Sequence, residues 1–274
     1  MNLSVAACQI LTYPDVQKSA EKIAEWIREA SDQDVDVVAF PEASLCGYES
    51  TEDYWKKAEP DNFVSAEEKI IEVSKECGIA VVLGTAHWED GALFNSILAI
   101  DKDGTVRGRY AKTHLAESWP VPGHTLPIYN LAGFRSCFLV CHDIRYPELV
   151  RLPAIAGAQI CYFCSNESGL LSEHKLSAYR AMPIARATEN GIFVVMTNAP
   201  GDPDDLRNGS QSHGNSKIIH PDGNVLQEAG HFEETLVVYA VNIAEATRSV
   251  AERSVNDETI LKEWMKDGSN LVTG

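Results

Sequence analysis

The order of apolar segments along the chain repeats once, and this repeat constrains the fold more than any other feature of the sequence. Each half begins with an apolar strand, continues through two pairs of helix and strand, and ends in a hairpin, so the order β-α-β-α-β-hairpin occurs twice. No close sequence identity accompanies the repeat, which is therefore a repeat of structure. The predicted strands cover residues 3–9, 35–40, 79–85, 93–100, 105–112, 134–141, 158–164, 192–198, 216–220, 224–227 and 234–241.

Most of these strands are apolar on both faces, so both faces of their sheets must be covered. The sequence therefore predicts an α/β protein with one sheet from each half packed face to face and helices outside, as a four-layer α-β-β-α sandwich. A single doubly wound sheet is the alternative that the pattern leaves open. We expect one domain over residues 1–274, in which about 244–274 form a C-terminal surface helix and tail.

The helices are placed by apolar periodicity. Pro14 and Asp15 open the first helix, and a second is expected from about Ala66 to Cys77, where Gly78 follows. In the second half, helices are expected at residues 147–157 and at about 173–190. The apolar stripe of the first helix consists of Val16, Ala20, Ile23, Ala24 and Ile27.

The charge of the chain argues against two classes of partner. Its formal net charge is −17, from 23 Lys and Arg residues against 40 Asp and Glu residues, and no basic patch stands apart. Such a chain repels phosphate backbones and anionic lipid headgroups. The sequence also begins without a basic, apolar leader, and no apolar run approaches the roughly 18 residues of a membrane span. We therefore expect no nucleic acid partner, no membrane partner and a cytoplasmic location.

The cysteine pattern and the absent motifs narrow the chemistry further. Seven scattered cysteines, an odd number, are not typical of a disulfide framework, so we expect them to be reduced. Cys161 and Cys164 form a CxxC within a predicted strand, where residues three apart point to opposite faces and cannot hold one metal ion. No phosphate-binding loop, dinucleotide fingerprint, zinc-protease motif or serine nucleophile elbow occurs. The sequence predicts neither a metal nor an organic cofactor.

Three polar residues stand directly after predicted strands, where open α/β folds place ligands. Glu42 follows the strand at 35–40, Lys112 closes a hairpin strand, and Cys141 closes the strand at 134–141. Taken singly, a salt-bridged Glu, a solvated Lys and a buried inert Cys are the ordinary interpretations. The combination favours catalysis, because a thiol needs a base to take its proton and a cation to stabilise the thiolate and the oxyanion.

The strings around these residues resemble those of the nitrilase-like carbon-nitrogen hydrolases. FPEASLCGY resembles the glutamate motif of that family, YAKTHL its lysine motif and CHDIRYPE its cysteine motif. The likeness continues through ARATENGIFVV and GNSKIIHPDG, so it spans nearly the whole chain. The resemblance implies the α-β-β-α sandwich, with Glu42 as general base, Lys112 as oxyanion stabiliser and Cys141 as nucleophile.

The resemblance also implies a second glutamate and shows two departures. ESWPVPG places Glu117 where many members carry a further catalytic glutamate, with a solvent-facing structural carboxylate as the alternative. His142 stands where the family usually has an aromatic residue or Asn. The usual small Gly before the nucleophile is replaced by Val140 and its two apolar predecessors. The pocket lining is therefore expected to differ from the family pattern.

Four side chains are expected to bind substrate. His142 either takes part as an acid or base or forms a wall of the pocket. Arg145 either pairs with a substrate carboxylate or forms an ion pair with Glu148. Asn166 and Glu167 follow a strand beside the expected pocket and are expected to line it.

The predicted function is hydrolysis of a non-peptide C–N bond in an amide or N-carbamoyl group of a small molecule. A thioester on Cys141 would be the intermediate, and ammonia or an amine would be released. Nitrile hydrolysis by the same triad and a catalytically impaired binding protein of the same fold are the alternatives. By resemblance we expect a homodimer or a higher homo-oligomer, built on the helix at residues 147–157.

Overall fold

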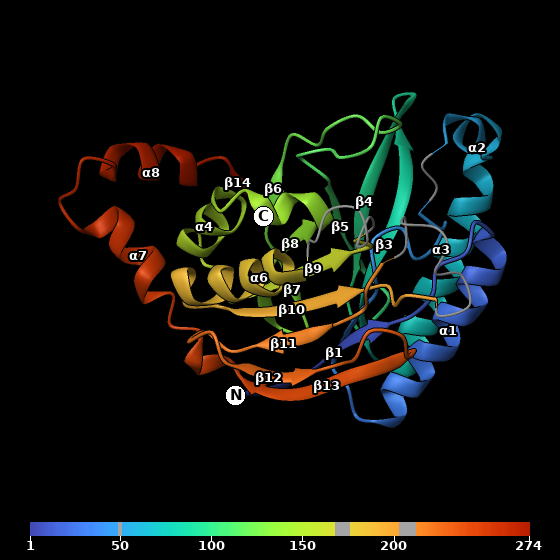
Figure 1. Cartoon of the computed structure of the whole chain (residues 1–274), viewed down its shortest axis with the longest axis horizontal. Helices are drawn as coiled ribbons and strands as arrows, with labels where there is room; N and C mark the ends of the chain where they lie inside the picture. The colour runs from blue at the N-terminus through green and yellow to red at the C-terminus, as the bar shows by residue number, and fades with distance from the viewer. Residues whose placement is uncertain (49–50, 168–175, 203–211) are drawn as a thin grey trace.

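The structure is a computed structural model that describes residues 1–48, 51–167, 176–202 and 212–274. Two six-stranded sheets pack against each other in this part of the chain, and helices cover their outer faces (Figure 1). The strand orders are β13-β1-β2-β3-β4-β5 in the first sheet and β12-β11-β10-β9-β8-β7 in the second. The predicted four-layer sandwich is confirmed, and the alternative of a single doubly wound sheet is wrong.

The strands of the two sheets agree with the predicted segments to within a few residues, except that β7, like the short strands β6 and β14, was not predicted. The first sheet consists of β13 (Thr235–Asn242), β1 (Asn2–Gln9), β2 (Val37–Ala39), β3 (Ala80–Glu89), β4 (Ala92–Ile100) and β5 (Val106–Ala111). The second consists of β12 (Val225–Glu228), β11 (Lys217–Ile219), β10 (Phe193–Asn198), β9 (Ile160–Ser165), β8 (Phe134–Val140) and β7 (Tyr129–Leu131). A short parallel pair joins β6 (Leu126–Pro127) to β14 (Val272–Thr273).

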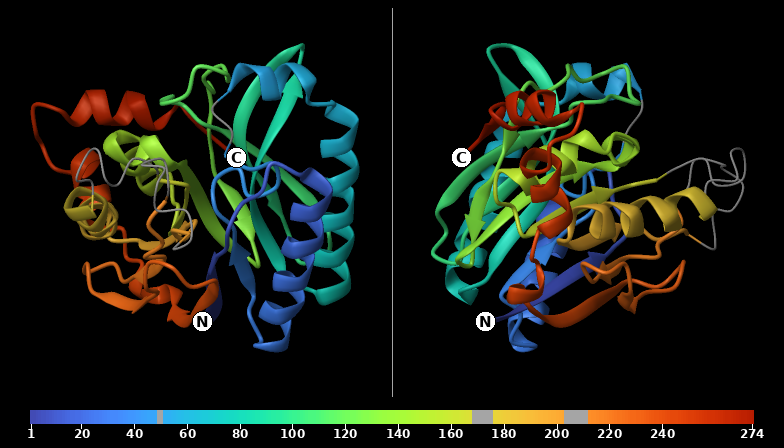
Figure 2. Two further views of the ribbon diagram at one scale, coloured as in Figure 1. Left: turned by 45° about the vertical axis from the view of Figure 1, so that its right-hand side comes forward. Right: turned by 90° about the vertical axis from the view of Figure 1, so that its left-hand side faces the viewer.

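The helices form the two outer layers and the C-terminal region. Helices α1 and α3 cover the first sheet, while α4 and α6 cover the second (Figure 2). The helices are α1 (Val16–Asp32), α2 (Glu52–Lys57), α3 (Pro60–Cys77), α4 (Glu148–Ile155), α6 (Leu176–Asn190), α7 (Ser249–Asn256) and α8 (Lys262–Ser269), with 3-10 turns η1 (Cys141–Arg145) and η3 (Ile243–Glu245).

Strand β9 shows why the layers are needed. Its side chains alternate: Tyr162 and Cys164 pack between the two sheets, whereas Cys161 and Phe163 pack against the helices of the second sheet. All four are fully buried, so neither face of the sheet could be left to solvent. The prediction that Cys161 and Cys164 point to opposite faces is confirmed.

The first helices begin at their capping signals. Asp15 is the N-cap of α1, and its side chain accepts a hydrogen bond of 3.1 Å from the Lys18 N–H. Helix α3 begins at Pro60 rather than at about Ala66, because Pro is well placed in the first turn of a helix while the polar residues after it interrupt the apolar stripe. Gly78 ends α3 in the left-handed conformation, with φ of 64°.

The last long strand, β13, does not belong to the sheet formed by the rest of its own half of the chain. Strand β13 comes from the second half of the chain but pairs antiparallel with β1, placing Leu3 opposite Val241 in the first sheet. The crossing leaves β11 and β12 as the hairpin of the second sheet, and it ties the two sheets together covalently at one edge.

The C-terminal segment is a pair of helices and a strand rather than one helix and a tail. Helices α7 and α8 follow η3 and lie beside α4, and β14 then returns to pair with β6 (Figure 1). Within the described ranges, no helix combines the length and the apolar character that crossing a membrane requires.

Candidate active site

The ends of strands from both sheets bring the predicted site residues together. Strand β2 runs parallel to β3, and β5 has the same direction because two antiparallel pairings separate it from β3. Glu42 and Lys112 therefore follow their strands at the same end of the first sheet. The Glu42 N–H donates to the Ser165 carbonyl oxygen at 3.3 Å, and this bond links that end of the first sheet to the end of β9 in the second sheet.

Gly84 of β3 allows the chain after β2 to turn close to the sheet. A Cβ atom at this position would overlap the carbonyl oxygen of Pro41, so a glycine is required. The Leu45 N–H and the Ser44 hydroxyl each donate to the Gly84 carbonyl oxygen at 3.1 Å. The turn that carries Glu42 is therefore fixed from two sides.

Glu42 is fully buried and fully hydrogen-bonded. Its Oε1 accepts hydrogen bonds of 2.8 Å from Asn95 Nδ2 and 2.8 Å from Lys112 Nζ, and its Oε2 accepts one of 3.1 Å from the Asn166 N–H. Burial raises the pKa of Glu42 to about 7, the positive charge of Lys112 opposes that rise, and the negative charge of Glu117 adds to it. A carboxylate with such a pKa can both take and return a proton near neutral pH.

Lys112 lies between two carboxylates. Its ammonium group donates to Glu42 Oε1 and, at 2.6 Å, to Glu117 Oε1, and its side chain is inaccessible to solvent. Burial alone would lower the pKa of Lys112, but the charges of Glu42 and Glu117 outweigh it and the pKa is raised. The cation is therefore permanently charged.

Glu117 joins the same network and does not face solvent. Its Oε1 also accepts a hydrogen bond of 2.6 Å from the Tyr48 hydroxyl, and its side chain is 3% exposed. Burial would raise the pKa of Glu117, but Lys112 and Tyr48 outweigh it and the pKa is lowered. Glu117 is thus the ionised member of the pair of glutamates.

Cys141 comes from the second sheet, at the point where β8 gives way to η1. Its backbone has φ of 42°, a conformation that residues other than Gly rarely adopt and that strained functional positions often show. The thiol is 6% exposed and donates to Glu167 Oε2 at 3.4 Å. Burial and the Glu42 charge raise the pKa of this thiol well above its ordinary value, and Lys112 opposes them. At rest the sulfur is therefore protonated and faces a carboxylate.

Asp143 connects the segment around Cys141 to the segment around Lys112 through hydrogen bonds. This buried carboxylate accepts hydrogen bonds of 2.8 Å from the Tyr110 hydroxyl, 2.8 Å from the His114 N–H and 3.2 Å from the Val140 N–H. The first two donors flank Lys112 in the sequence and the third precedes Cys141. Asp143 therefore fixes the two catalytic segments relative to each other.

The next two predicted residues lie further out. His142 is half-buried, and burial, followed by the charges of Arg145 and Lys112, lowers the pKa of its imidazole. Arg145 is exposed, and its guanidinium carbon lies 5.8 Å from the centre of the Tyr179 ring. Arg145 and Glu148 are both exposed, and among the described residues no ion pair joins them. The structural alternative for Arg145 is therefore not supported.

Asn166 and Glu167 follow β9 into the same region. Asn166 is 7% exposed, and besides its backbone bond to Glu42 its Nδ2 donates to Thr12 Oγ1 at 3.2 Å. Glu167 is 2% exposed, and its N–H donates to Asn198 Oδ1 at 3.0 Å. The structure brings both residues to the triad, Asn166 through the base and Glu167 through the nucleophile.

Several residues of this network were not singled out from the sequence. Tyr48 and Asp143 lie inside the FPEASLCGY and CHDIRYPE strings, which could have drawn attention to them. Asn95 lies within β4 and has no comparable sequence signal. It reaches Glu42 because β4 pairs with β5, and the Lys112 N–H donates to the Asn95 carbonyl oxygen at 2.8 Å.

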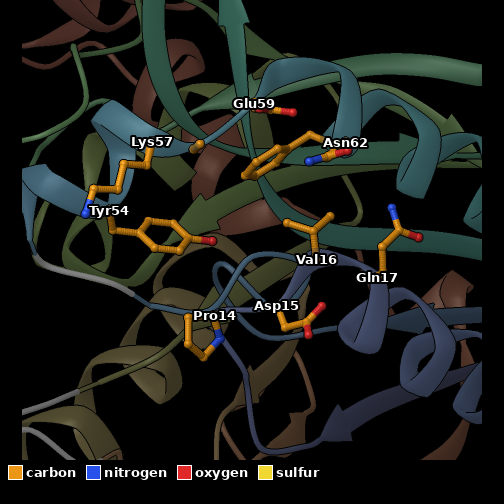
Figure 3. Close-up of a pocket in the computed structure, with 10 residues that line it drawn as sticks. Pro14, Asp15, Val16, Gln17, Tyr54, Lys57, Glu59 and Asn62 are labelled. Carbon is orange, nitrogen blue, oxygen red and sulfur yellow. The ribbon is translucent and has the colours of Figure 1, made fainter.

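A cavity of about 360 Å³ lies elsewhere, between the start of α1 and the segment of α2 and α3 (Figure 3). Asp15, Lys57 and Glu59 contribute its charged groups, and none of the predicted site residues lines it. The candidate site is thus defined by converging hydrogen bonds rather than by this cavity. Over the ranges that the structure describes, no group of three or more His, Cys, Asp or Glu side chains is arranged to hold a metal ion.

Comparisons with known proteins agree with this geometry. The family profile described as carbon-nitrogen hydrolase matches residues 4–249. The chain is 32% identical over 211 residues to an (R)-stereoselective amidase from a Pseudomonas species, covering 75% of this chain and 73% of that protein. It is 31% identical over 231 residues to a 2-oxoglutaramate amidase from Bacillus subtilis, covering 82% of this chain and 85% of that protein.

A solved structure matches over a similar length. It is a mutant of the amidase from Nesterenkonia sp. AN1 with the acetamide moiety of fluoroacetamide covalently added at the active-site cysteine. The match has a TM-score of 0.78 and 25% identity, and it covers 89% of this chain and 92% of that one. The chain therefore belongs to the carbon-nitrogen hydrolase family, the nitrilase superfamily, and is a hydrolase of the amidase and nitrilase type.

Proposed function

We propose that the protein hydrolyses the C–N bond of a small-molecule amide or N-carbamoyl compound through a thioester on Cys141. The observation that carries the proposal is that Glu42 bonds to Lys112 and to the Asn166 N–H, while the next residue, Glu167, accepts the hydrogen bond from Cys141 of the other sheet. Glu42 acts as the base, Lys112 stabilises the oxyanion and Cys141 is the nucleophile. Glu117 holds Lys112 in place and keeps it charged.

The first half of the reaction forms the thioester. Glu42 takes the thiol proton, and the sulfur of Cys141 attacks the carbonyl carbon to give a tetrahedral intermediate. The Lys112 ammonium and the backbone N–H of His142 stabilise the oxyanion. The C–N bond then breaks, and the leaving nitrogen receives the proton from Glu42 and departs as ammonia or an amine.

The second half regenerates the thiol. Glu42, now ionised, takes a proton from a water molecule, whose oxygen attacks the thioester carbon. The C–S bond breaks as the intermediate collapses, and the proton returns from Glu42 to the sulfur of Cys141. Because burial raises the pKa of Glu42 to about 7, both directions of proton transfer are feasible near neutral pH.

The relatives support amides ahead of nitriles. Two of the matched proteins are amidases by name, and a variant of the Nesterenkonia amidase binds acrylamide. A nitrilase from Pyrococcus abyssi, 28% identical over 256 residues, keeps nitrile hydrolysis as the second candidate. Both reactions begin with attack by Cys141 and differ in the electrophile.

Release of ammonia tests the proposal. Simple amides, N-carbamoyl amino acids, ω-amides and nitriles are incubated with the wild-type protein, with Cys141→Ala as the blank. We expect turnover of at least one amide or N-carbamoyl compound and none by the variant. Turnover confined to nitriles would select the second candidate, and the absence of any turnover would favour a binding protein of the same fold.

We also propose that the protein is a homodimer or a higher homo-oligomer built on α4 and the helices beside it. Large apolar side chains are exposed around α7 and α8, and clusters of this kind mark interfaces. These side chains are Val250, Ile260, Leu261 and Trp264. Light scattering on the purified protein tests the oligomeric state, and a monomer at micromolar concentration would contradict the proposal.

A cytoplasmic location is also proposed, and the seven free cysteines support it.

A further inference from the structure

His213, just before β11, is a buried polar side chain that the proposed reaction does not use. It is 2% exposed, and both of its ring nitrogens are buried without a hydrogen bond in the part of the chain that is described. Its backbone is held, because the His213 carbonyl oxygen bonds to His231 Nδ1 at 2.6 Å. Buried polar atoms of folded proteins are nearly always hydrogen-bonded, so this imidazole calls for a ligand.

Asn198, at the end of β10, fixes His213 relative to Glu167. The Asn198 side chain is fully buried, and its Oδ1 accepts hydrogen bonds of 2.9 Å from Ser212 Oγ and 3.0 Å from the Glu167 N–H. Its Nδ2 donates at 2.8 Å to the Gly214 carbonyl oxygen. Since Ser212 and Gly214 flank His213, these three bonds tie the segment of His213 to the segment of Glu167.

Tyr179 of α6 connects the imidazole to the region of the nucleophile. Its ring packs edge to face against that of His213, with ring centres 6.3 Å apart. The Tyr179 hydroxyl hydrogen-bonds to the side chain of Glu167, whose Oε2 accepts the 3.4 Å hydrogen bond from Cys141 Sγ. Three successive contacts therefore lead from the sulfur to the imidazole, a span that an acyl chain of a few carbon atoms can cover.

The state of the ring favours one kind of ligand group. Burial lowers the pKa of His213, although the charge of Glu167 opposes this change, so the ring is neutral at pH 7. A neutral imidazole has one N–H donor and one lone pair. A hydroxyl group both donates and accepts, so it can pair with either nitrogen, whereas an ammonium only donates and a carboxylate only accepts. An ion would also lose its hydration without gaining an opposite charge from the ring.

The chemistry of the reaction says which part of the substrate reaches His213. When ammonia is the leaving group, every other atom of an amide belongs to the acyl part. We propose that His213 hydrogen-bonds a neutral donor and acceptor group on the acyl part of the substrate, of which a hydroxyl is the simplest. The inference rests on the proposed function, because it specifies which amides that reaction takes.

Arg145 offers a competing kind of recognition. Its guanidinium carbon lies 5.8 Å from the centre of the Tyr179 ring, and the side chain is exposed, so it can pair with a substrate carboxylate. Water already solvates an exposed guanidinium, whereas the buried imidazole gains a hydrogen bond only from the substrate. We therefore expect discrimination between neutral amides to come from His213.

Three matched pairs of amides test the proposal on the wild-type protein. Hydroxyacetamide, 3-hydroxypropanamide and 4-hydroxybutanamide are compared with propanamide, butanamide and pentanamide, in which a methyl group replaces the hydroxyl. At the chain length that reaches His213, we expect kcat/KM for the hydroxyamide to exceed that of its partner by about 10-fold or more. At the other lengths the hydroxyl is buried without a partner, so the alkyl amide should be the better substrate.

Variants at residue 213 assign the preference to the imidazole. His213→Phe keeps a ring and removes both nitrogens, so the ratio of kcat/KM between the preferred hydroxyamide and its alkyl partner should fall by about 10-fold. His213→Asn and His213→Gln each restore a donor and an acceptor, and at least one of them should recover part of the ratio. His220→Gln, in the turn between β11 and β12, removes an imidazole elsewhere and is expected to leave the ratio unchanged. Circular dichroism checks that each variant is folded.

A binding measurement keeps the test independent of turnover. The same pairs of amides are titrated into Cys141→Ala and into the double variant Cys141→Ala/His213→Phe, and binding is followed by NMR. We expect tighter binding of the preferred hydroxyamide by about 10-fold in the first protein and loss of that difference in the second.

The outcomes separate this inference from the proposed function. Hydrolysis of the amides without a preference for a hydroxyl at any length overturns the inference alone. A preference that survives in His213→Phe, or a loss by one common factor for both members of a pair, also shows that His213 does not select the substrate. Selective binding without any hydrolysis supports recognition by His213 and contradicts the proposed function. If the amides are neither bound nor hydrolysed, both are contradicted.

Discussion

Glu42 and Cys141 both stand just after a buried strand, yet their surroundings differ. Glu42, from the first sheet, accepts three hydrogen bonds of 2.8–3.1 Å and belongs to a continuous network with Lys112 and Glu117. Among the described residues, the Cys141 side chain, from the second sheet, makes one hydrogen bond, of 3.4 Å, and its backbone has a positive φ. Glu42 and Lys112, the proposed base and cation, are thus held by a dense hydrogen-bond network, whereas Cys141, the proposed nucleophile, is held by fewer and weaker hydrogen bonds among the described residues.

This difference has a chemical reason. The base and the cation serve every step and gain from fixed geometry, since preorganised charges need no rearrangement during the reaction. The proposed nucleophile forms and breaks a bond with the substrate carbon, so the weak hydrogen bond that its thiol makes with Glu167 is lost at little cost. Substitution of Lys112 is therefore expected to lower both stability and activity, whereas substitution of Cys141 is expected to lower activity alone.

The largest effect is expected from Cys141→Ala. The variant loses the nucleophile, so the rate of ammonia release should fall by roughly 10⁴-fold or more. Because no strong hydrogen bond is lost, the melting temperature should remain close to that of the wild-type protein. Activity assays and thermal unfolding measured on the same sample check both halves of this statement. Residual turnover near the wild-type rate would refute the assignment of the nucleophile.

Lys112→Met tests the network on the first-sheet side. Loss of an oxyanion donor typically lowers the rate by about 10²- to 10³-fold. Removal of one partner from a buried charge network also costs roughly 3–5 kcal/mol of unfolding free energy, because Glu42 and Glu117 lose their common cation. Urea unfolding should therefore show a marked loss of stability, in contrast to Cys141→Ala. Equal stability of the two variants would mean that the hydrogen-bond network of Glu42, Lys112 and Glu117 does not stabilise the fold.

Gly84→Ala tests how tightly the turn that carries Glu42 packs against β3. The new methyl group would overlap the Pro41 carbonyl oxygen, which is backbone and cannot move aside cheaply. We expect a loss of unfolding free energy of about 2 kcal/mol or more, together with lower activity. Gly268→Ala in α8 is the matched control, since its nearest neighbour is the flexible end of the Leu152 side chain. Similar stabilities of the two variants would contradict the argument.

The sequence was sufficient to predict the layers, and it singled out three residues that the structure brings into one region, for physical reasons. Strands that are apolar on both faces require covering on both sides, and β9 shows that requirement residue by residue. Glu42, Lys112 and Cys141 could be found because each stands at or just past the end of a predicted strand. The surrounding family motifs then assigned their roles.

The remaining features depend on pairings that the sequence pattern does not encode. Asn95 contacts Glu42 only because Ser96 pairs with Ala111, and a slip of one residue would turn its side chain to the other face. Likewise, nothing within β13 indicates that it joins the sheet of the first half. Glu167 was predicted to line the pocket, but its contact with the sulfur depends on where η1 places Cys141.

Glu117→Gln sharpens the comparison through the pH dependence of the reaction. The base acts only when it is ionised, so kcat/KM for a neutral amide should rise with pH through about 7, to which burial raises the pKa of Glu42. Removing the Glu117 charge removes a neighbour that raises this pKa, so the midpoint of the profile should move to lower pH. Glu72→Gln, which removes the same charge at an exposed position on α3, is the control and is expected to leave the midpoint in place. A midpoint that stays or moves upward in Glu117→Gln would contradict the electrostatic coupling.

The smallest effect is expected from substitution of His220, whose ion pairs connect the two sheets near the surface. His220, in the turn between β11 and β12, pairs at 2.8 Å with Asp222 and at 2.8 Å with Glu245 of η3, which follows β13 of the first sheet. Burial would lower the pKa of His220, but the hydrogen bonds to Glu245 and Asp222 outweigh it and the pKa is raised. The resulting stabilisation is complete below the pKa of an unfolded His, about 6.5, and is lost as pH rises through the raised value.

His220→Gln should therefore lower the unfolding free energy at pH 5.5 by about 0.2–1 kcal/mol, the range of partly exposed ion pairs, and by less at pH 8.5. Urea unfolding at the two pH values measures the difference. Activity is expected to change little, because His220 contacts none of the catalytic groups described above. An effect that grows with pH would reverse the sign of the argument, and a loss as large as that of Lys112→Met would mean that this outer link, rather than the buried network, holds the sheets together.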